Sequence, residues 1–392
     1  MAVTPAINYD VEALREQQFP LTRDTVYLNH AGISPLPRRT VDAMRKATEY
    51  IMLDPAESFE HYFLPRLMTF GESIRELINA QSGSEIVGVS STSLGLNLAA
   101  QALPWKQGDN IVLTDGEFPS NVYPWLRLQE QFGVEIRMIP NQSGMTLDGL
   151  TAFVDGKTRL VAVSMVQFFT GHRTDLTAIG AFCREHHILF AVDAIQAICH
   201  LPIDVQAMNI DILATGGQKS LMGPPGQGFM YVREALANEM RPTLVGANAV
   251  VDFEHWLKYD LTFQPGAARF GLGTPSIIDM VGLLESISFL RELGIANIGA
   301  HTTALADMLI ERLREVGYAV ITPAVHGPIV TFRAAETQEA TVVLLEKLKA
   351  QRIFIAKHWD AQDVSHLRVS FHCYNNLTDI DRLLSVLKEN RQ

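Results

Sequence analysis

The chain has 392 residues, of which 47% are hydrophobic and 19% charged, and its formal net charge is −11. This length is enough for two domains, and no uninterrupted apolar run approaches the roughly 18 residues that span a bilayer. We therefore expect no membrane as a partner, and because the net negative charge would repel a phosphate backbone we expect no nucleic acid either. An N-terminus without a secretory pattern and only three cysteines (Cys183, Cys199 and Cys373) favour a cytoplasmic protein.

Short apolar, β-branched runs alternate with longer stretches of helical period through the first two thirds of the chain. Strands are predicted at 111–114, 134–139, 160–164, 188–193 and 212–215, and a further strand is predicted after the turn at 226. Such alternation is typical of βαβ units on a mostly parallel sheet. A glycine-rich loop between Gly266 and Gly273 and a long helix from about Ser276 close this part of the chain.

The last hundred residues follow a different pattern. From about Leu293, helical stretches at 298–316 and 337–351 flank short strands at 319–321 and 329–332, which indicates a small α+β domain. We therefore expect an α/β protein with a large domain at 26–290 and a small C-terminal domain at 291–392. Residues 1–25 are predicted to form an N-terminal segment that packs on the small domain.

The most informative pattern is an aspartate at the end of a buried strand, followed by a lysine after the next strand. Asp193 stands in Ala-Val-Asp-Ala-Ile-Gln, and Lys219 stands in the small-residue loop Thr-Gly-Gly-Gln-Lys-Ser. Open α/β sheets bind ligands at the carboxyl ends of their strands. A lysine held there, rather than on an exposed helix, is suited to be a partly desolvated amine that forms an imine. Alone, Asp193 would be a helix cap and Lys219 a surface charge, but together they favour a site.

These segments resemble the class V aminotransferase family of fold-type I pyridoxal 5'-phosphate (PLP) enzymes. The family includes cysteine desulfurases, C–S lyases, kynureninases and isopenicillin-epimerase-like proteins, and the resemblance runs almost end to end. It implies PLP as cofactor, with Lys219 as the catalytic Schiff-base lysine and no metal. Asp193 would lie beside the pyridine nitrogen, where a buried carboxylate keeps that nitrogen protonated. Gln196 would donate to the phenolic oxygen of the cofactor.

The resemblance also places the phosphate of PLP. Thr92 and Ser93, in Ser-Thr-Ser-Leu-Gly-Leu-Asn, match the family's phosphate loop, which presents hydroxyls and backbone amides at a helix start. Gly95 would leave room for close approach. Gln218 matches a position where relatives often carry a phosphate-binding His, and Gly216 falls where relatives often have Ser, so one phosphate contact is expected to be missing or replaced.

Two further matches concern the partner subunit and the cofactor ring. Thr274 resembles a residue that relatives contribute to the phosphate site of the partner, which implies a homodimer. Phe118, in Gly-Glu-Phe-Pro-Ser-Asn, takes the place of the aromatic ring that stacks on the cofactor. Persulfide-forming desulfurases usually have His there.

The substrate would be held by residues from both ends of the chain. Arg368, in Leu-Arg-Val-Ser-Phe-His, resembles the family's clamp for the substrate α-carboxylate, a task that suits a planar guanidinium. Asn29 and His30 resemble the N-terminal loop that closes over the substrate. Gln167 falls near the position of the family's side chain that faces the cofactor's oxygen and the substrate.

The reaction is less closely determined than the cofactor. Desulfurases of this family use a mobile-loop cysteine shortly before the clamp arginine, but 352–368 contains none and Cys373, expected at a helix start, lies beyond it. We expect an aminotransferase acting on a small L-amino acid. A β-eliminating C–S lyase that lacks a catalytic cysteine, or an epimerase, stays open as an alternative, and a catalytically silent PLP-binding protein is the hypothesis of a different class.

Overall fold

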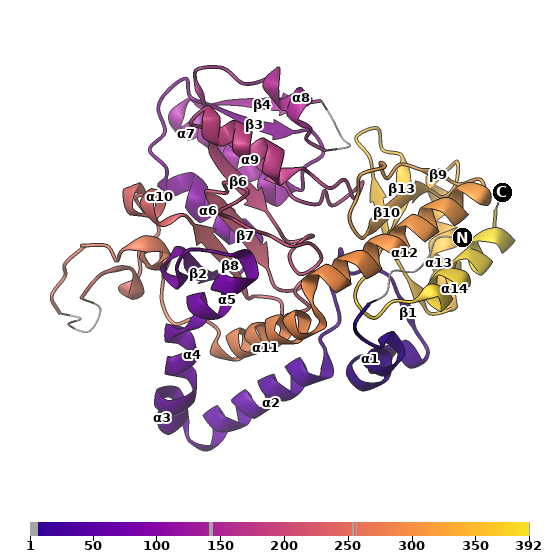
Figure 1. Cartoon of the computed structure of the whole chain (residues 1–392), viewed down its shortest axis with the longest axis horizontal. Helices are drawn as coiled ribbons and strands as arrows, with labels where there is room; N and C mark the ends of the chain where they lie inside the picture. The colour runs from indigo at the N-terminus through magenta and orange to yellow at the C-terminus, as the bar shows by residue number, and fades with distance from the viewer. Residues whose placement is uncertain (1–6, 141–143, 253–254, 256, 392) are drawn as a thin grey trace.

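The computed structural model describes residues 7–391 apart from 141–143, 253–254 and 256. Figure 1 shows a large domain with a central sheet and a small domain beside it, joined by one long helix. No single helix of the described part is long and apolar enough to cross a bilayer, although one adjacent pair, Ile277–Leu293 and Ile295–Glu315, bent by 78°, passes that test jointly by length and composition.

The large domain is built on a seven-stranded sheet in the order β2-β8-β7-β6-β5-β3-β4. The strands are β2 (Ile86–Val89), β3 (Asn110–Thr114), β4 (Glu135–Ile139), β5 (Thr158–Ser164), β6 (Leu189–Asp193), β7 (Ile212–Gly216) and β8 (Gly228–Val232). Strands β4, β3, β5, β6 and β7 are mutually parallel, and β8 runs antiparallel to both of its neighbours. The mostly parallel sheet predicted from the sequence is therefore confirmed.

Helices cover both faces of this sheet. The helices of the large domain are α2 (Arg38–Leu53), α3 (Pro55–Ser58), α4 (Leu64–Met68), α5 (Phe70–Ile78), α6 (Thr92–Ala102), α7 (Tyr123–Phe132), α8 (Leu147–Thr151), α9 (Leu176–Glu185), α10 (Glu234–Glu239) and α11 (Ile277–Leu293). Of these, α2, α3 and α4 extend away from the sheet (Figure 1). Single turns lie between them, namely η2 (Phe59–Phe63), η3 (Gly83–Glu85), η4 (Pro119–Asn121), η5 (Ala247–Ala249) and η6 (Gly266–Phe270).

The core explains why the central strands read as continuous apolar runs. On β5 and β6, successive side chains pack into hydrophobic clusters on opposite faces of the sheet. Val163 and Phe190 pack on one face, and Ala162 and Ala191 pack on the other. Side chains of a strand alternate between its two faces. Because helices bury both faces, both sets must be apolar, and polar side chains are left for the carboxyl ends of the strands.

The small domain pairs a four-stranded antiparallel sheet, β12-β13-β10-β9, with helices. Its elements are α12 (Ile295–Glu315), β9 (Ala319–Val320), β10 (Ile329–Arg333), α13 (Gln338–Ala350), β11 (Ile353–Phe354), β12 (Ala356–Trp359), β13 (Ser365–Ser370) and α14 (Leu377–Glu389). The domain begins at Gly294, whose positive φ of 84° lets the chain bend between α11 and α12. This bend lies four residues after the predicted boundary at 290.

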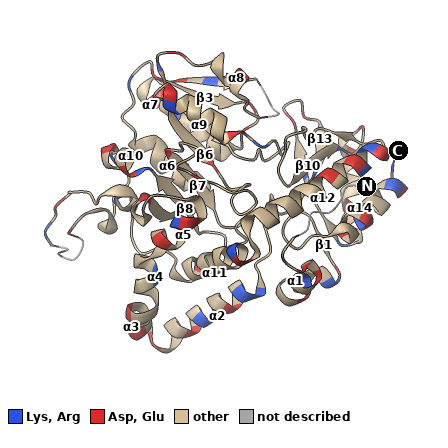
Figure 2. Ribbon diagram, viewed as in Figure 1, with Lys and Arg blue, Asp and Glu red and all other residues tan. Residues whose placement is uncertain are grey.

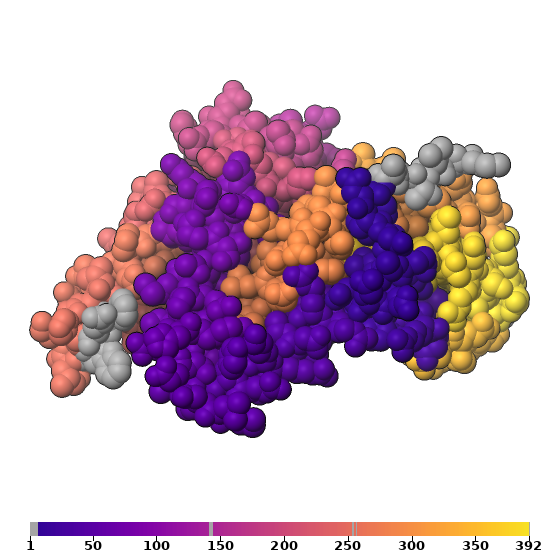
Figure 3. Space-filling view, turned by 60° about the horizontal axis from the view of Figure 1, so that its bottom comes forward, coloured from indigo at the N-terminus to yellow at the C-terminus, as the bar shows by residue number. Residues whose placement is uncertain are grey.

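The N-terminal segment packs on the small domain, as Figure 3 shows in indigo against yellow. It consists of α1 (Val11–Gln18), η1 (Pro20–Arg23) and β1 (Val26–Tyr27). Strand β1 pairs in parallel with β11, so the predicted boundary after residue 25 falls just before a strand that belongs with the small domain. Residues 1–6 of the predicted segment lie outside the described residues. Charges of both signs are interspersed along α2 and the outer helices (Figure 2).

Candidate active site

A cavity of about 310 Å³ lies where the carboxyl ends of the parallel strands face the small domain. Seven of the residues predicted from the sequence line it: Thr92, Ser93, Phe118, Asp193, Gln218, Lys219 and Arg368. They come from the loops after β3 and β7, from the end of β6, from the start of α6, and from β13 of the small domain. The fold therefore brings together residues that lie far apart in the sequence, from Thr92 to Arg368.

One end of the cavity is the start of α6. Ser91 caps the helix, because its Oγ accepts a hydrogen bond from the Leu94 amide at 3.1 Å. The Oγ atoms of Ser93 and Ser120 lie 2.6 Å apart. The hydroxyl of Thr92 is buried and has no hydrogen-bond partner among the described residues. A helix start with free amides and hydroxyls is a site for a phosphate group.

Gly216 and Gln218 form a matched pair beside this end. A Cβ atom added at Gly216 would lie 2.5 Å from the Gln218 side-chain oxygen and 3.3 Å from Ile195. The amide of Gln218 therefore occupies the space that a side chain at position 216 would need. The two departures from the family pattern are thus coupled, since the glycine makes room for the glutamine.

Gly95 has a different role from the one expected. Its added Cβ would lie 3.0 Å from the Cβ of Ala214 and 3.5 Å from that of Met230, both in the sheet. The glycine therefore lets α6 approach the sheet closely and does not make room for a ligand. This corrects the prediction, and the physical reason is helix-to-sheet packing.

Lys219 lies at the centre of the cavity, in the loop after β7. It is almost wholly buried, and its Nζ lies 5.0 Å from the centroid of the Phe118 ring. Burial lowers the pKa of Lys219 to about 8; the Asp193 carboxylate opposes this shift and the Arg368 charge adds to it. A lysine amine with a pKa near neutrality is suited to act as a nucleophile and a base.

Asp193 ends β6, and its Oδ1 accepts the backbone amide of Ile195 at 3.0 Å. Burial raises the pKa of this carboxyl to about 7, while the Ile195 amide and the Lys219 charge oppose the rise. A cationic ring nitrogen beside it would favour the carboxylate form.

Gln196 does not line the cavity. Its Nε2 donates to the backbone oxygen of Ala31 at 3.0 Å, so in the structure it anchors the N-terminal loop at a residue that lines the cavity.

Arg368 reaches the cavity from β13. Its Nη1 donates to the backbone oxygen of Phe168 at 2.7 Å, and its Nε is buried without a partner among the described residues. Burial lowers its pKa to about 10, so the guanidinium keeps its charge at neutral pH. It can offer its remaining N–H groups to a carboxylate.

Three predicted substrate residues lie outside the cavity wall. Asn29 forms a bridge with Ser370, and the Nδ1 of His30 lies 2.9 Å from the Oγ of Ser34. The next residues along the same loop, Ala31 and Gly32, line the cavity instead. The predicted loop is therefore present, but Ala31 and Gly32 line the cavity, while the Asn29 amide packs against Gly32 with its Oδ1 buried and unpartnered among the described residues.

Gln167 holds a turn instead of facing the cavity. Its Oε1 accepts the Phe169 amide at 2.9 Å and the Thr170 hydroxyl at 3.0 Å, and its Nε2 donates to the Gly116 carbonyl. Its amide is thus used to join the loop after β5 to the loop after β3.

Thr274 is exposed and does not line the cavity of its own chain.

Seven cavity residues were not among the predicted site residues: Ala31, Gly32, Ser91, Ser120, Phe168, Ile195 and His358. Phe168 and Ser120 each lie close in sequence to a predicted residue, so proximity to the strand ends could have found them. His358 gave no such signal, because it comes from β12, a strand that was not predicted.

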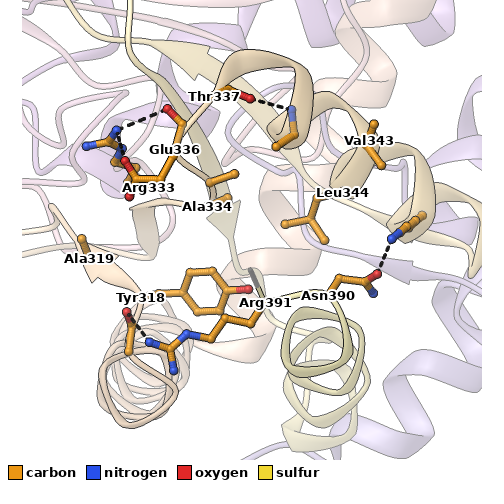
Figure 4. A pocket seen from close by; sticks show the side chains of 14 residues that line it. Tyr318, Ala319, Arg333, Ala334, Glu336, Thr337, Val343, Leu344, Asn390 and Arg391 are labelled. Carbon is orange, nitrogen blue, oxygen red and sulfur yellow. Dashed lines mark hydrogen bonds and ion pairs between the residues drawn. The ribbon is translucent and has the colours of Figure 1, made fainter.

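A second, larger cavity of about 400 Å³ lies in the small domain (Figure 4). Each of its charged side chains has at least one partner, although the Nε of Arg333 has none among the described residues. Arg333 bonds Glu336 at 2.9 Å, Lys347 bonds Asn390 at 2.5 Å, and Arg391 bonds the Gly317 carbonyl at 3.4 Å. None of the predicted residues lines this cavity, and we do not assign the reaction to it.

The residues of the first cavity fit PLP. The unpartnered hydroxyl of Thr92 at a helix start suits the phosphate, Phe118 offers a ring face, Asp193 offers a carboxylate for the pyridine nitrogen, and Lys219 offers an amine. Fold and site together define a PLP-dependent enzyme of fold type I.

Comparison with known proteins agrees with this class. The family Aminotransferase class-V matches residues 26–383, and the chain belongs to that family. The probable cysteine desulfurase of Pyrococcus abyssi is 30% identical over 393 residues, which is 95% of this chain and 96% of the relative. That of Methanothermobacter thermautotrophicus is 33% identical over 301 residues, 75% of this chain and 73% of the relative.

Solved structures share the fold over nearly the whole chain. The apo cysteine desulfurase from Thermococcus onnurineus NA1 has a TM-score of 0.86 at 27% identity and covers 100% of this chain and 99% of its own. The cystine C–S lyase C-DES, in complex with its product cysteine persulfide, has a TM-score of 0.87 at 23% identity and covers 95% and 99%. At that identity the second likeness shows the fold alone.

Proposed function

We propose that this protein is a PLP-dependent lyase that eliminates a sulfur substituent from the β-carbon of a small L-amino acid of the cysteine class. One observation carries the proposal. Lys219, Asp193 and Arg368 meet in one small cavity, and none of the described residues lining it is a cysteine. Relatives named cysteine desulfurases support a sulfur-bearing substrate. We therefore place this alternative ahead of the aminotransferase activity expected from the sequence.

A persulfide carried on the enzyme is disfavoured by the cysteines themselves. Cys183, Cys199 and Cys373 are all buried and free, and Cys373 lies in the turn before α14 instead of at its first residue. Burial raises the pKa of each of these thiols, to about 12 for Cys183. Because a thiolate is the reactive form, such cysteines are poor nucleophiles.

The chain's own residues divide the chemistry among them. Arg368 binds the substrate carboxylate, and Lys219 in its neutral form removes the proton from the α-carbon. The electron pair of that C–H bond then forms the bond between the α- and β-carbons, and the sulfur leaves with the pair of the β-carbon–sulfur bond. PLP supplies the electron sink when bound, and Asp193 holds the positive charge of its ring nitrogen. With cysteine and water, the balanced products are pyruvate, ammonia and hydrogen sulfide.

The test is to record the visible spectrum of the purified, PLP-loaded protein while L-cysteine, L-cystine and other L-amino acids are added singly. We expect pyruvate with ammonia and sulfide or a persulfide, and return of the original spectrum. A lasting shift to the pyridoxamine form, reversed by a keto acid, would establish an aminotransferase instead. A PLP-loaded protein whose spectrum does not change and that yields no product with any of these amino acids would favour a silent relative.

A homodimer in which Thr274 reaches the partner's cofactor phosphate is part of the proposal. Two observations support it. Thr274 is exposed and away from its own cavity, and the segment after α10 projects from the body with Leu257 86% and Tyr259 91% exposed (Figure 1). Exposed apolar patches mark association surfaces.

A mixing experiment tests this arrangement. Thr274→Glu would repel a phosphate in the partner's site, and Lys219→Ala removes the amine from its own site. We expect unfolding and refolding of the two inactive variants together to restore activity, because each mixed dimer has one intact site. Activity that stays absent, or a monomer in light scattering, would contradict the dimer.

A further inference from the structure

His358 lies on the same face of the small sheet as Arg368. In the antiparallel pair of β12 and β13, Ala356 faces Arg368 and His358 faces His366. Residues two apart on a strand point to one side, so His358 and Arg368 are diagonal neighbours on that side. Among the described residues that line the first cavity, these two are the small domain's contribution.

The His358 ring is held in place but not hydrogen-bonded at its Nε2. It contacts the ring of Phe168 edge-on at 5.9 Å and that of Phe169 at 6.5 Å between centroids. The Nε2 atom is buried and has no partner in the part of the chain that the structure describes. A buried polar atom without a partner is costly, which indicates that a ligand group meets it.

The ring is neutral at physiological pH. Burial lowers the pKa of His358 to about 3, and the charges of Arg368 and Lys219 add to this effect. A neutral imidazole offers one N–H donor and one acceptor nitrogen. It therefore suits a group such as a thiol, a disulfide or a departing thiolate.

Two of the three substituents on the substrate's α-carbon, the carboxylate and the amine, already have binding groups in the cavity. The Nη1 of Arg368 is used by the Phe168 carbonyl, which leaves Nε and Nη2 as one edge for the two oxygens of a carboxylate. The substrate amine would react beside Lys219, where PLP would be held. The third substituent of the α-carbon is the side chain, and the unused polar atom of His358 is available for it.

We propose that His358 hydrogen-bonds the sulfur on the β-carbon of the substrate and thereby selects cysteine-class amino acids over those with an apolar side chain. This inference rests on the proposed function of the site. When sulfur leaves with the electron pair of its bond to the β-carbon, the imidazole N–H donates to it. The interaction strengthens as charge develops on sulfur, so His358 contributes to the rate as well as to selection.

The experiment compares PLP-loaded His358→Phe and His358→Asn with the control Lys357→Asn, which lies on the opposite face of the same strand. Stopped-flow absorbance gives the Kd of L-cysteine, of L-alanine, which lacks sulfur, and of cysteamine, which lacks the carboxylate. We expect His358→Phe to raise the Kd of L-cysteine and of cysteamine roughly tenfold, as for one lost hydrogen bond. The Kd of L-alanine should stay within about twofold of the wild-type value. His358→Asn should recover part of the loss, and Lys357→Asn should show none.

Two outcomes would overturn the inference. Equal weakening of L-cysteine and L-alanine with cysteamine unchanged would mean that His358 contacts the carboxylate. No weakening of L-cysteine in either His358 variant would mean that it contacts nothing on the substrate. Failure of the proposed function is separate, because it would appear as wild-type protein that binds L-cysteine but forms no pyruvate.

Discussion

The guanidinium of Arg368 donates from Nη1 to the backbone oxygen of Phe168 at 2.7 Å, and this bond joins a strand of the small domain to the loop after β5 of the large domain. The same side chain leaves its Nε buried and unpartnered among the described residues. One arginine thus aligns the two domains and retains free donors for a substrate.

Arg368→Gln is expected to weaken amino-acid substrates selectively. Removing one partner of a buried, hydrogen-bonded charge pair costs about 2–5 kcal/mol, so kcat/KM for L-cysteine should fall at least roughly thirtyfold. Cysteamine has no carboxylate and should lose much less. Steady-state kinetics on both compounds checks this, and equal losses for the two would exclude the carboxylate role.

The pKa of Lys219 sets a pH dependence for cofactor capture. Burial lowers this pKa to about 8, and the amine attacks the aldehyde of PLP only when neutral. The rate at which apoprotein takes up PLP should therefore rise up to about pH 8 and level off above it. Rapid-mixing absorbance between pH 6.5 and pH 10 measures it. A rate that still climbs steeply above about pH 9 would show an ordinary lysine pKa.

Much of this site could be predicted because its chemistry is coupled to strand ends. Asp193 and Lys219 follow two buried strands whose apolar runs mark them clearly, and the parallel sheet brings such ends together. Side-chain direction could not be predicted in the same way. Gln196 and Gln167 are amides near the correct backbone positions, yet each bonds a nearby backbone group that no sequence pattern reveals.

The small domain shows a second limit. Strand β12, with Ala-Lys-His-Trp, has no clear apolar alternation, and its burial is only partial along its length. It is a strand because it pairs with β13, which tertiary contact decides and local sequence does not. His358 was missed for that reason.

Asp193→Asn should separate cofactor binding from catalysis. The amide has nearly the same shape but no charge to hold the ring nitrogen protonated, so PLP should still bind while kcat falls by roughly a hundredfold or more. Absorbance of bound PLP and kcat for pyruvate release measure the two effects. Retention of full activity would remove Asp193 from its role.

The same variant should change the stability of the apoprotein with a defined sign. Burial raises the pKa of Asp193 to about 7, above that of an unfolded aspartate, so the folded apoprotein binds this proton more tightly. The group therefore costs stability progressively as pH rises from about 4 to about 7. Urea unfolding at several pH values should show wild type losing stability relative to Asp193→Asn across that window. If the free energy of unfolding changed with pH in the same way for both proteins, the raised pKa of Asp193 would be contradicted.

Gly216 and Gln218 should behave as one unit toward the cofactor phosphate. A side chain at position 216 would meet the end of the flexible Gln218 side chain at 2.5 Å, so Gly216→Ser should displace that amide without unfolding the protein. We expect the Kd for PLP to rise roughly tenfold, as for one lost hydrogen bond, with little change in Tm. Gly216→Ser combined with Gln218→His, the pair common in relatives, should bind PLP within about threefold of wild type, because neighbouring substitutions are not additive. Titration of the apoproteins with PLP completes the double-mutant cycle, and additive losses would show that the two positions act independently.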